Sequence, residues 1–260
     1  MLSYQHIYHA GNLADVHKHA LMAFILDYLI QKEKPLTYME THAGRGLYAL
    51  DAAEARKTGE AAQGILRLEE RLPATHPYRR ALAETRKLYG AQAYPGSPML
   101  AALLLRQIDA IHLAELHPQE FAALAENLAP HRVLTHKRDG LEMAMAMTPP
   151  TPRRGVLLLD PSYEMKEDYE TIPKVIGQIA RKWNVGTIAL WYPILTSAAH
   201  LSMRMALTNA HPEALCHEVM FPPAREGHGM IGSGMFVINA PWGSQEEASR
   251  LSAIFAALRR

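Results

Sequence analysis

Short apolar runs alternate with helical patterns from one end of the chain to the other. The runs predict seven strands, at residues 36–40, 110–115, 132–136, 155–159, 186–191, 214–220 and 233–238. Several of these runs are continuous and rich in leucine, isoleucine and valine, as expected for strands that are covered on both faces of a parallel sheet.

Helical patterns fill the intervals between these strands. They predict helices at residues 17–31, 98–107, 118–128, 140–147, 167–182, 196–209 and 244–259. The alternation of strand and helix predicts an α/β fold with a doubly wound sheet. Ligands of such sheets bind outside the carboxyl ends of the strands, at the point where the strand order reverses. The residues that follow the strands are therefore the candidates for a functional site.

The interval between the first two strands is longer than one crossover requires. It spans residues 41–109, whereas a strand–helix–strand crossover needs about 30 residues in total. Residues 51–95 have a helical pattern, so we expect an inserted helical subdomain there, with residues 1–50 and 96–260 forming the main domain. The insertion carries eight lysines and arginines against six acids, which fits either a solvated helical face or a surface that contacts RNA.

The composition excludes several classes of protein. With 48% apolar and 20% charged residues, the chain of 260 residues can bury a full core, and disorder is not expected. No apolar run is long enough to span a membrane, and the polar, histidine-rich start lacks the apolar region of a signal peptide. The single cysteine, Cys216, excludes intramolecular disulfides and thiolate zinc clusters. We therefore expect a soluble, cytoplasmic protein.

Glycines and acids follow four of the predicted strands. Gly44 and Gly46 let the backbone approach a ligand closely, although the third glycine and the later acid of a dinucleotide fingerprint are missing. Glu115 can accept both hydroxyls of a ribose, or it can be the acid that precedes a helix. Asp139 can accept from an adenine amino group, or it can cap a turn or helix. Together with Asp160, these residues form the set that a nucleoside-containing cofactor needs.

The stretch LLLDPSYE, at residues 157–164, ends a buried strand with Asp160, Pro161, Ser162 and Tyr163. Asp160 can accept one hydrogen bond from an aromatic amino group and the carbonyl of Pro161 can accept the other, which favours a lone pair on the nitrogen. Tyr163 can stack on the base, and Asp160 can take up the proton that leaves after methylation. The alternative is that Asp160 caps the following helix and Tyr163 packs on its side.

Eight stretches, spread in order over nearly the whole chain, carry a resemblance to a known family. They are LSYQHIYHAGNLADVHKHA at 2–20, THAGRGLY at 41–48, YPGSP at 94–98, ELHP at 115–118, DG at 139–140, LLLDPSYEMK at 157–166, ALWYPI at 189–194 and SGMFVINAPW at 233–242. Together they resemble the bacterial 23S ribosomal RNA adenine-N6 methyltransferases of the RlmJ (YhiR) family. The resemblance implies a class I S-adenosylmethionine-dependent methyltransferase, with a Rossmann-like doubly wound sheet, an inserted helical subdomain and S-adenosyl-L-methionine as cofactor.

The resemblance also implies roles for individual residues. The implied cofactor-binding residues are His19, His42, Ser97, Glu115, Asp139, Gly140 and Asp160. Asp160 is also the implied acceptor of the leaving proton. Tyr4 is implied to contact the RNA substrate, and we expect the same of His6 and Lys18, which lie in the same N-terminal motif, residues 1–20. The family pattern has a second proline where this chain has Ser162, which should affect loop rigidity more than activity.

Four histidines of the N-terminal motif could suggest a metal site. They are His6, His9, His17 and His19. No carboxylate-rich segment lies at a suitable spacing, so we expect no metal. A polar, aromatic and weakly basic segment fits contact with RNA and cofactor better.

We expect a monomer that methylates N6 of a specific adenine in 23S rRNA and does not bind membranes. The net charge of +1 predicts modest affinity and a preference for naked or partly assembled RNA. Three alternatives remain: a DNA adenine-N6 methyltransferase, a protein glutamine-N5 methyltransferase, and a non-catalytic RNA-binding module. The identity of the methyl acceptor distinguishes them.

Overall fold

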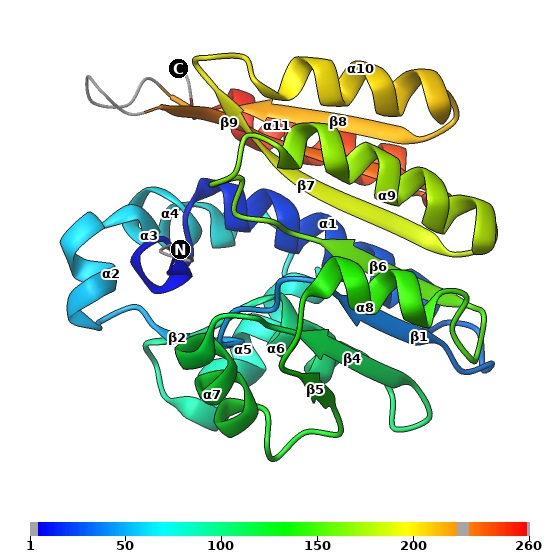
Figure 1. The fold of residues 1–260 in the computed structure, drawn as a ribbon. Helices are drawn as coiled ribbons and strands as arrows, with labels where there is room; N and C mark the ends of the chain where they lie inside the picture. Colours follow the sequence, from blue (N-terminus) through cyan, green and yellow to red (C-terminus); the bar gives the residue numbers. More distant parts are fainter. Residues whose placement is uncertain (1–4, 223–228, 259–260) are drawn as a thin grey trace.

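Seven strands form the central sheet. The structure is a computed structural model that describes residues 5–222 and 229–258. The strands of the sheet are β1 (Thr37–Glu40), β4 (Ala110–Ala114), β5 (Leu134–His136), β6 (Gly155–Leu159), β7 (Thr187–Leu195), β8 (Leu215–Met220) and β9 (Met230–Ile238). Their order is β5-β4-β1-β6-β7-β9-β8, and neighbours are parallel except that β9 runs antiparallel to β7 and β8 (Figure 1). All seven predicted strands are confirmed.

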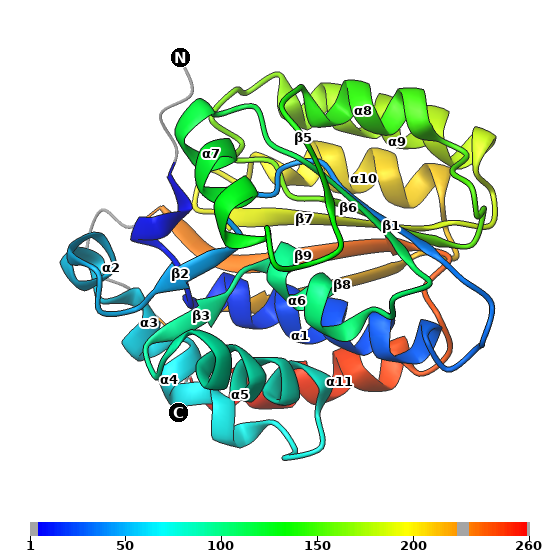
Figure 2. The same ribbon diagram turned by 90° about the horizontal axis from the view of Figure 1, so that it is seen from below.

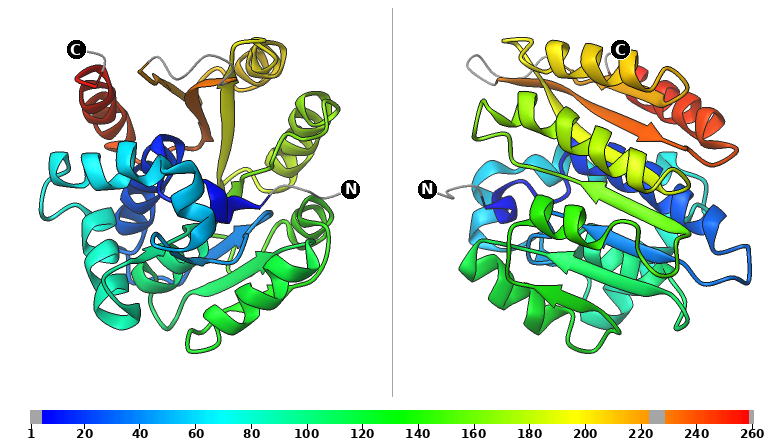
Figure 3. Two further views of the ribbon diagram at one scale, coloured as in Figure 1. Left: turned by 90° about the vertical axis from the view of Figure 1, so that its left-hand side faces the viewer. Right: turned by 45° about the vertical axis from the view of Figure 1, so that its right-hand side comes forward.

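Helices cover both faces of the sheet, as the continuous apolar strands predict (Figure 3). They are α1 (Leu13–Leu29), α6 (Ser97–Leu104), α7 (Pro118–Asn127), α8 (Gly140–Met147), α9 (Asp168–Lys182), α10 (His200–Ala210) and α11 (Ser244–Ala256). Successive residues of β6 point to opposite faces. Val156 and Leu158 belong to the apolar cluster that includes α1 and α11, whereas Leu157 and Leu159 belong to the cluster that includes α9 and α10. The seven predicted helices are confirmed.

The observed start of two helices differs from the predicted start for local reasons. Helix α1 begins before residue 17 because Asn12 caps it: the Asn12 side chain accepts a hydrogen bond from the backbone N–H of Asp15. Helix α10 begins later than predicted, at His200. Ala198, just before it, has a positive φ of 57°, which is a turn conformation and not a helical one.

The strand order reverses beside β1. The chain runs from β1 outward to β4 and β5, returns to β6 on the other side of β1, and continues to β7. Doubly wound sheets bind their ligands at the carboxyl ends of the strands next to such a reversal. The ends of β1 and β6 are therefore the place to look for a site.

Residues 51–95 are largely helical, as predicted, and lie beside α1 (Figure 2). They contain α2 (Ala53–Thr58), α3 (Glu60–Gln63), α4 (Ile65–Leu68), the 3-10 turn η2 (Glu69–Arg71) and α5 (Pro77–Tyr89). The sequence did not predict the short antiparallel pair of β2 (Leu47–Ala49) and β3 (Ala93–Pro95) that flanks them. Ile65 and Tyr78 are buried in the same apolar cluster as Leu21 of α1. The insertion thus shares a core with the main sheet, and its status as a separate subdomain stays a prediction.

The first described residues form a short 3-10 turn, η1 (His6–Tyr8), which lies beside α2 and precedes α1 (Figure 1).

Among the helices that the structure describes, none has the length and apolar character needed to cross a membrane.

Candidate active site

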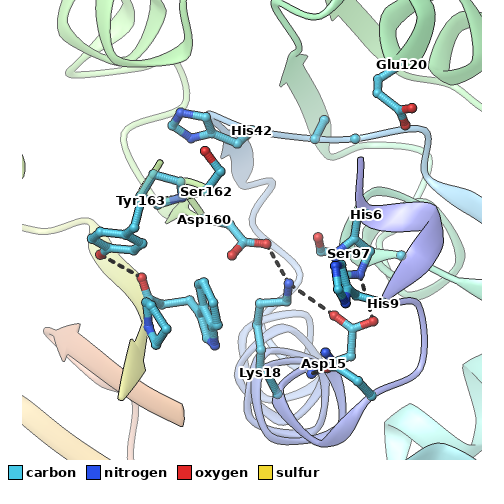
Figure 4. Close-up of a pocket in the computed structure, with 18 of the residues that line it drawn as sticks. His6, His9, Asp15, Lys18, His42, Ser97, Glu120, Asp160, Ser162 and Tyr163 are labelled. Carbon is cyan, nitrogen blue, oxygen red and sulfur yellow. Dashed lines mark hydrogen bonds and ion pairs between the residues drawn. The ribbon is translucent and has the colours of Figure 1, made fainter. Parts of the chain in front are cut away.

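A cavity of about 290 Å³ lies at the carboxyl ends of the strands next to the reversal. Helix α1 and the N-terminal segment, residues 5–12, also bound this cavity. The predicted residues that line it are His6, Lys18, His19, His42, Ser97, Glu115, Asp160, Pro161 and Tyr163 (Figure 4). Asp139 and Gly140 are not among the lining residues, and Tyr4 lies outside the residues that the structure describes. One cavity therefore brings together residues that are far apart in the sequence.

Asp160 forms an ion pair with Lys18 inside this cavity (Figure 4). The Lys18 ammonium lies 2.5 Å from Oδ2 of Asp160 and 3.3 Å from Oδ1 of Asp15. Burial opposes the charge on Lys18, but the two carboxylates outweigh burial and raise the pKa of the ammonium. Asp160 and Lys18 come from the end of β6 and from α1, so only the fold brings them together.

Asp15 is a buried carboxylate that organises the start of α1. It accepts hydrogen bonds from the His6 imidazole and from the backbone N–H of Gly11, both at 2.9 Å. Burial disfavours its charge, yet the neighbouring His6 and Lys18 hold the pKa of Asp15 well below its usual range. Sequence reasoning assigned Asp15 no role. The available signal was its position three residues before Lys18, on the same helix face.

Glu40, the last residue of β1, is fully buried beside these charges. It accepts hydrogen bonds from the hydroxyl of Tyr38 at 2.9 Å and from the hydroxyl of Ser97 at 2.5 Å. Burial, assisted by the nearby Asp160, raises the pKa of Glu40 to about 8, although the two hydroxyls and Lys18 oppose the shift. Sequence reasoning also missed Glu40, and the signal was an acid at the end of the first apolar strand.

Burial favours the neutral form of two histidines of the implied cofactor set. His19 lies with Nδ1 3.0 Å from the hydroxyl of Tyr94, and burial lowers the pKa of His19 to about 3. His42 follows β1, with Nδ1 2.7 Å from the hydroxyl of Thr41, and burial lowers its pKa as well. Because Nδ1 is already bound in both rings, each imidazole can offer its Nε2 atom to a polar ligand, as donor or acceptor according to the tautomer.

The glycine-containing loop after β1 is tied to Glu115. Oε2 of Glu115 accepts the backbone N–H of Gly44 at 2.8 Å, and Oε1 accepts the backbone N–H of His117 at 2.7 Å. Gly44 has a φ of +60°, and a Cβ there would lie 2.7 Å from the hydroxyl of Tyr48, so the position requires glycine. Each oxygen of Glu115 keeps a further lone pair, which is the capacity that two ribose hydroxyls need.

Asp139 and Gly140 begin α8. Oδ1 of Asp139 accepts the backbone N–H of Glu142 at 2.9 Å, which is the helix cap that the sequence allowed as an alternative. A Cβ on Gly140 would lie 1.8 Å from the carbonyl oxygen of Thr41, so glycine lets α8 approach the end of β1. The structure supplies a packing reason for both residues, and their implied contact with the cofactor stays a prediction.

Tyr163 forms part of the cavity wall. It has a φ of 54°, in the left-handed region that is costly for a bulky residue. Its hydroxyl donates to the carbonyl of Trp191 at 3.0 Å, and its ring lies on Tyr169 with centroids 4.7 Å apart. Only 9% of Tyr163 is exposed. Its stacking on a base stays a prediction.

Strand β7 extends beyond β6 and adds an apolar wall that sequence reasoning missed. The pairing of β6 with β7 stops before Trp191, whereas β7 continues to Leu195. Trp191, Pro193 and Leu195 alternate along this extension, and all three line the cavity. The indole N–H of Trp191 donates to Oγ of Ser233 at 2.9 Å, and the Lys18 ammonium lies 5.6 Å from its ring centroid.

The four histidines of the N-terminal motif have separate partners. His6 contacts Asp15, and His19 contacts Tyr94. His9 lies 2.9 Å from Glu60, and His17 lies 2.9 Å from both His217 and Ser233. In the part of the chain that the structure describes, no group of three or more His, Cys, Asp or Glu residues is arranged to hold a metal ion.

Comparison with known proteins connects this geometry to a family. Residues 33–257 match the model of the family described as "Ribosomal RNA large subunit methyltransferase D, RlmJ". The chain belongs to this family. The ribosomal RNA large subunit methyltransferase J of Escherichia coli is 38% identical over 256 residues, which cover 96% of this chain and 91% of the relative.

Two further proteins are similar over most of the chain. The protein of the same name from Haemophilus influenzae is 40% identical over 248 residues, which cover 93% of this chain and 88% of the relative. A crystal structure of a Legionella pneumophila protein is 32% identical, with a TM-score of 0.86 over 96% of this chain and 94% of the other. The shared fold and the family agree with the predicted architecture.

The protein is thus a class I methyltransferase, and S-adenosylmethionine is its cofactor, as predicted. The residues present fit this molecule. Glu115 has free acceptor capacity for hydroxyl groups, and Gly44 of the loop after β1 lines the cavity. The carboxylates of Asp15 and Asp160 provide negative charge for a positive sulfonium.

Proposed function

We propose that the protein transfers the methyl group of S-adenosylmethionine to the N6 amino group of an adenine in 23S ribosomal RNA. The observation that carries the proposal is the position of Asp160 and Pro161 in the cavity wall, at the end of β6. Two adjacent acceptors suit an amino group with two N–H bonds. The family and the names of the two RlmJ relatives support ribosomal RNA as the substrate.

In this mechanism Asp160 and the carbonyl of Pro161 each accept one N–H bond of the target amino group. The nitrogen lone pair of adenine is delocalised into the ring, and two acceptors favour its localisation on nitrogen. The cofactor supplies a methyl group that its positive sulfonium activates. Holding the amino group in line with this methyl supplies much of the rate. Asp160 then accepts the proton that the methylated nitrogen loses.

Lys18 prepares Asp160 for both tasks. Its ammonium, 2.5 Å from the carboxylate, holds Asp160 in one orientation. The second contact, to Asp15, keeps the ammonium in place when Asp160 takes up a proton. Lys18 is only 4% exposed. In this proposal it can therefore contact the RNA only through a base that is inserted into the cavity.

The RNA partner in this proposal is naked or partly assembled 23S rRNA in the cytoplasm, and the protein acts as a monomer. Tyr4 and His6 would contact the RNA around the target base, since His6 lines the cavity. The net charge of +1 gives little long-range attraction, so recognition depends on these local contacts.

Transfer of tritium from labelled S-adenosylmethionine to deproteinised 23S rRNA, duplex DNA and protein tests the proposal. We expect label in the rRNA, recovered as N6-methyladenosine after digestion. Label in DNA or in glutamine would instead support the corresponding alternative, and no label in any acceptor would support a non-catalytic RNA-binding module. Stronger labelling of mature ribosomes than of naked RNA would contradict the expected state of the substrate.

A further inference from the structure

The start of the insertion holds the segment that precedes α1. Glu60 of α3 lies between two residues of this segment: Oε1 is 2.9 Å from Nδ1 of His9, and Oε2 accepts the side-chain amide of Asn12 at 3.0 Å. The hydrogen bond with Glu60 also raises the pKa of His9. Thr58, at the end of α2, donates its hydroxyl to the carbonyl of Tyr8. Residues 8–12 are thus bound through side chains from one short stretch of the insertion.

Backbone packing strengthens this contact. The N–H of Ile65 donates to the carbonyl of Gly11 at 2.8 Å. A Cβ on Gly64 would lie 2.0 Å from that carbonyl oxygen, and Gly11 itself has a φ of +78°. Two glycines therefore meet where the insertion crosses the N-terminal segment, and each is needed for the close approach.

A continuous set of polar contacts leads from this junction to the methyl-transfer site. Asn12, bound by Glu60, accepts the backbone N–H of Asp15 at 2.9 Å. Asp15 also accepts the N–H of Gly11 at 2.9 Å, and its other oxygen lies 3.3 Å from Lys18. Lys18 in turn lies 2.5 Å from Asp160 (Figure 4). Each member fixes the position of the next.

We propose that Glu60 is a positioning residue for methyl transfer and that one function of the insertion is to anchor residues 8–12. The proposal rests on the proposed function. Segments with few buried apolar contacts open easily unless other parts of the protein hold them. When the anchor is lost, the cap of α1 and the partners of Asp15 become mobile, so Lys18 and Asp160 are misaligned even though neither is changed. The insertion thus acts through the N-terminal segment, in addition to any contact that it makes with RNA.

Substitution of Glu60 tests this role by kinetics and by amide hydrogen exchange. We expect Glu60→Ala to lower kcat on rRNA by about 10- to 100-fold and to speed exchange in a peptide covering residues 6–16 by a similar factor, because charge-assisted hydrogen bonds are lost. KM for RNA should stay unchanged. Glu60→Gln keeps an acceptor for Asn12 and should recover most of both losses. Gly64→Ala, which displaces the Gly11 carbonyl, should reproduce the effect of Glu60→Ala.

Glu70→Ala serves as the matched control, because Glu70 is exposed on η2 of the same insertion; neither kcat nor exchange should change. Unchanged kcat and exchange in Glu60→Ala would overturn the proposal, as would a defect confined to KM for RNA, which indicates direct RNA contact. If the wild-type protein labels no rRNA, the proposed function fails separately. In that case the exchange measurement still decides the anchor: faster exchange in Glu60→Ala supports it, and unchanged exchange overturns it.

Discussion

At the scale of single residues, the interaction between Asp160 and Lys18 determines how the carboxylate can act. A carboxylate with 15% of its side chain exposed and an ammonium 2.5 Å away has a fixed orientation before the substrate arrives. Preorganised groups cost no rearrangement at the moment of reaction. In the proposed mechanism, Asp160 therefore combines three roles: partner of Lys18, acceptor for an amino group, and acceptor of a proton.

Asp160→Asn separates these roles. The amide keeps the shape of the side chain but cannot take up the proton, so we expect kcat on rRNA to fall by about 10²- to 10⁴-fold. The affinity for S-adenosylmethionine, measured by calorimetry, should fall much less. Ser162→Ala is the control, because the side chain of Ser162 is exposed and has no role in the proposed mechanism. Unaltered turnover in Asp160→Asn would contradict the role assigned to Asp160.

We expect Trp191 to offer a flat surface on which the target base stacks beside Asp160. Tyr163 already has Tyr169 on one side and gives its hydroxyl to the strand, whereas Trp191 lies on the extension of β7 that lines the cavity. We expect Trp191→Ala to lower kcat/KM for rRNA. The loss should correspond to about 1–3 kcal/mol of transition-state stabilisation, the range for loss of one base–aromatic stack. Trp191→Phe should keep most of the activity.

Trp242→Ala is the control for this substitution, since Trp242 is 80% exposed and does not line the cavity. Equal rates for Trp191→Ala and Trp242→Ala, at equal Tm, would remove Trp191 from the site.

At the scale of elements, Gly140 decides how closely α8 approaches β1. A Cβ there would meet the Thr41 carbonyl at 1.8 Å, so α8 must shift. We expect Gly140→Ala to lower the free energy of unfolding of the cofactor-free protein by about 1–3 kcal/mol, as overpacking does. Urea denaturation measures this change. Gly177→Ala, inside α9 with a nearest contact of 3.7 Å, should instead raise stability slightly. Unchanged stability in Gly140→Ala would leave cofactor binding as the reason for glycine.

The length of an element and the sequence separation of its partners explain what the sequence could predict. Strands and helices of the main sheet were predictable because their apolar patterns are local in the sequence, and the acids at strand ends follow from that pattern. The β2–β3 pair was missed because each strand has three residues and its register depends on a partner more than 40 positions away. The pairing of Lys18 with Asp160 was missed for the same reason, since 142 positions separate them. The polar character of the N-terminal motif predicts contact with RNA and cofactor, but the protein partners of its side chains lie far away in the sequence, in the insertion, at the end of β6 and on β8 and β9.

At the scale of the whole molecule, Glu40 links stability to pH. Its pKa rises from an ordinary value of 4.5 to about 8 in the folded protein, mainly through burial. Between these values the folded protein holds a proton that the unfolded chain releases. Stability from this group is therefore present below about pH 4.5 and is lost as pH rises through 8.

Comparison of Glu40→Gln with the wild-type protein isolates this contribution. Glutamine keeps the shape of the side chain but does not titrate. The difference in unfolding free energy, wild type minus variant, should fall by about 1.4 kcal/mol per pH unit between pH 5 and 8. Urea denaturation at four pH values in this range measures it. Parallel stability curves for the two proteins would mean that Glu40 is ionised in the fold.

The net charge of the chain is only +1, so attraction to RNA depends on where the cations lie. Arg56 and Lys57 are exposed on α2, next to η1, and Lys57 lies 6.0 Å from the ring of Tyr8. Because His6 in η1 lines the cavity, phosphates that flank an inserted base would pass close to these two cations.

Replacing Arg56 and Lys57 together with glutamine should weaken rRNA binding and reduce the slope of log Kd against log salt by about 1.4, which is roughly 0.7 for each lost contact with single-stranded RNA. Turnover at saturating RNA should not change, because neither residue reaches the cavity. The double substitution of Lys32 and Lys34 by glutamine is the control, because both lie before β1, at the end of the sheet away from the site. Equal salt slopes for the two variants would leave the insertion with its anchoring role and no electrostatic one.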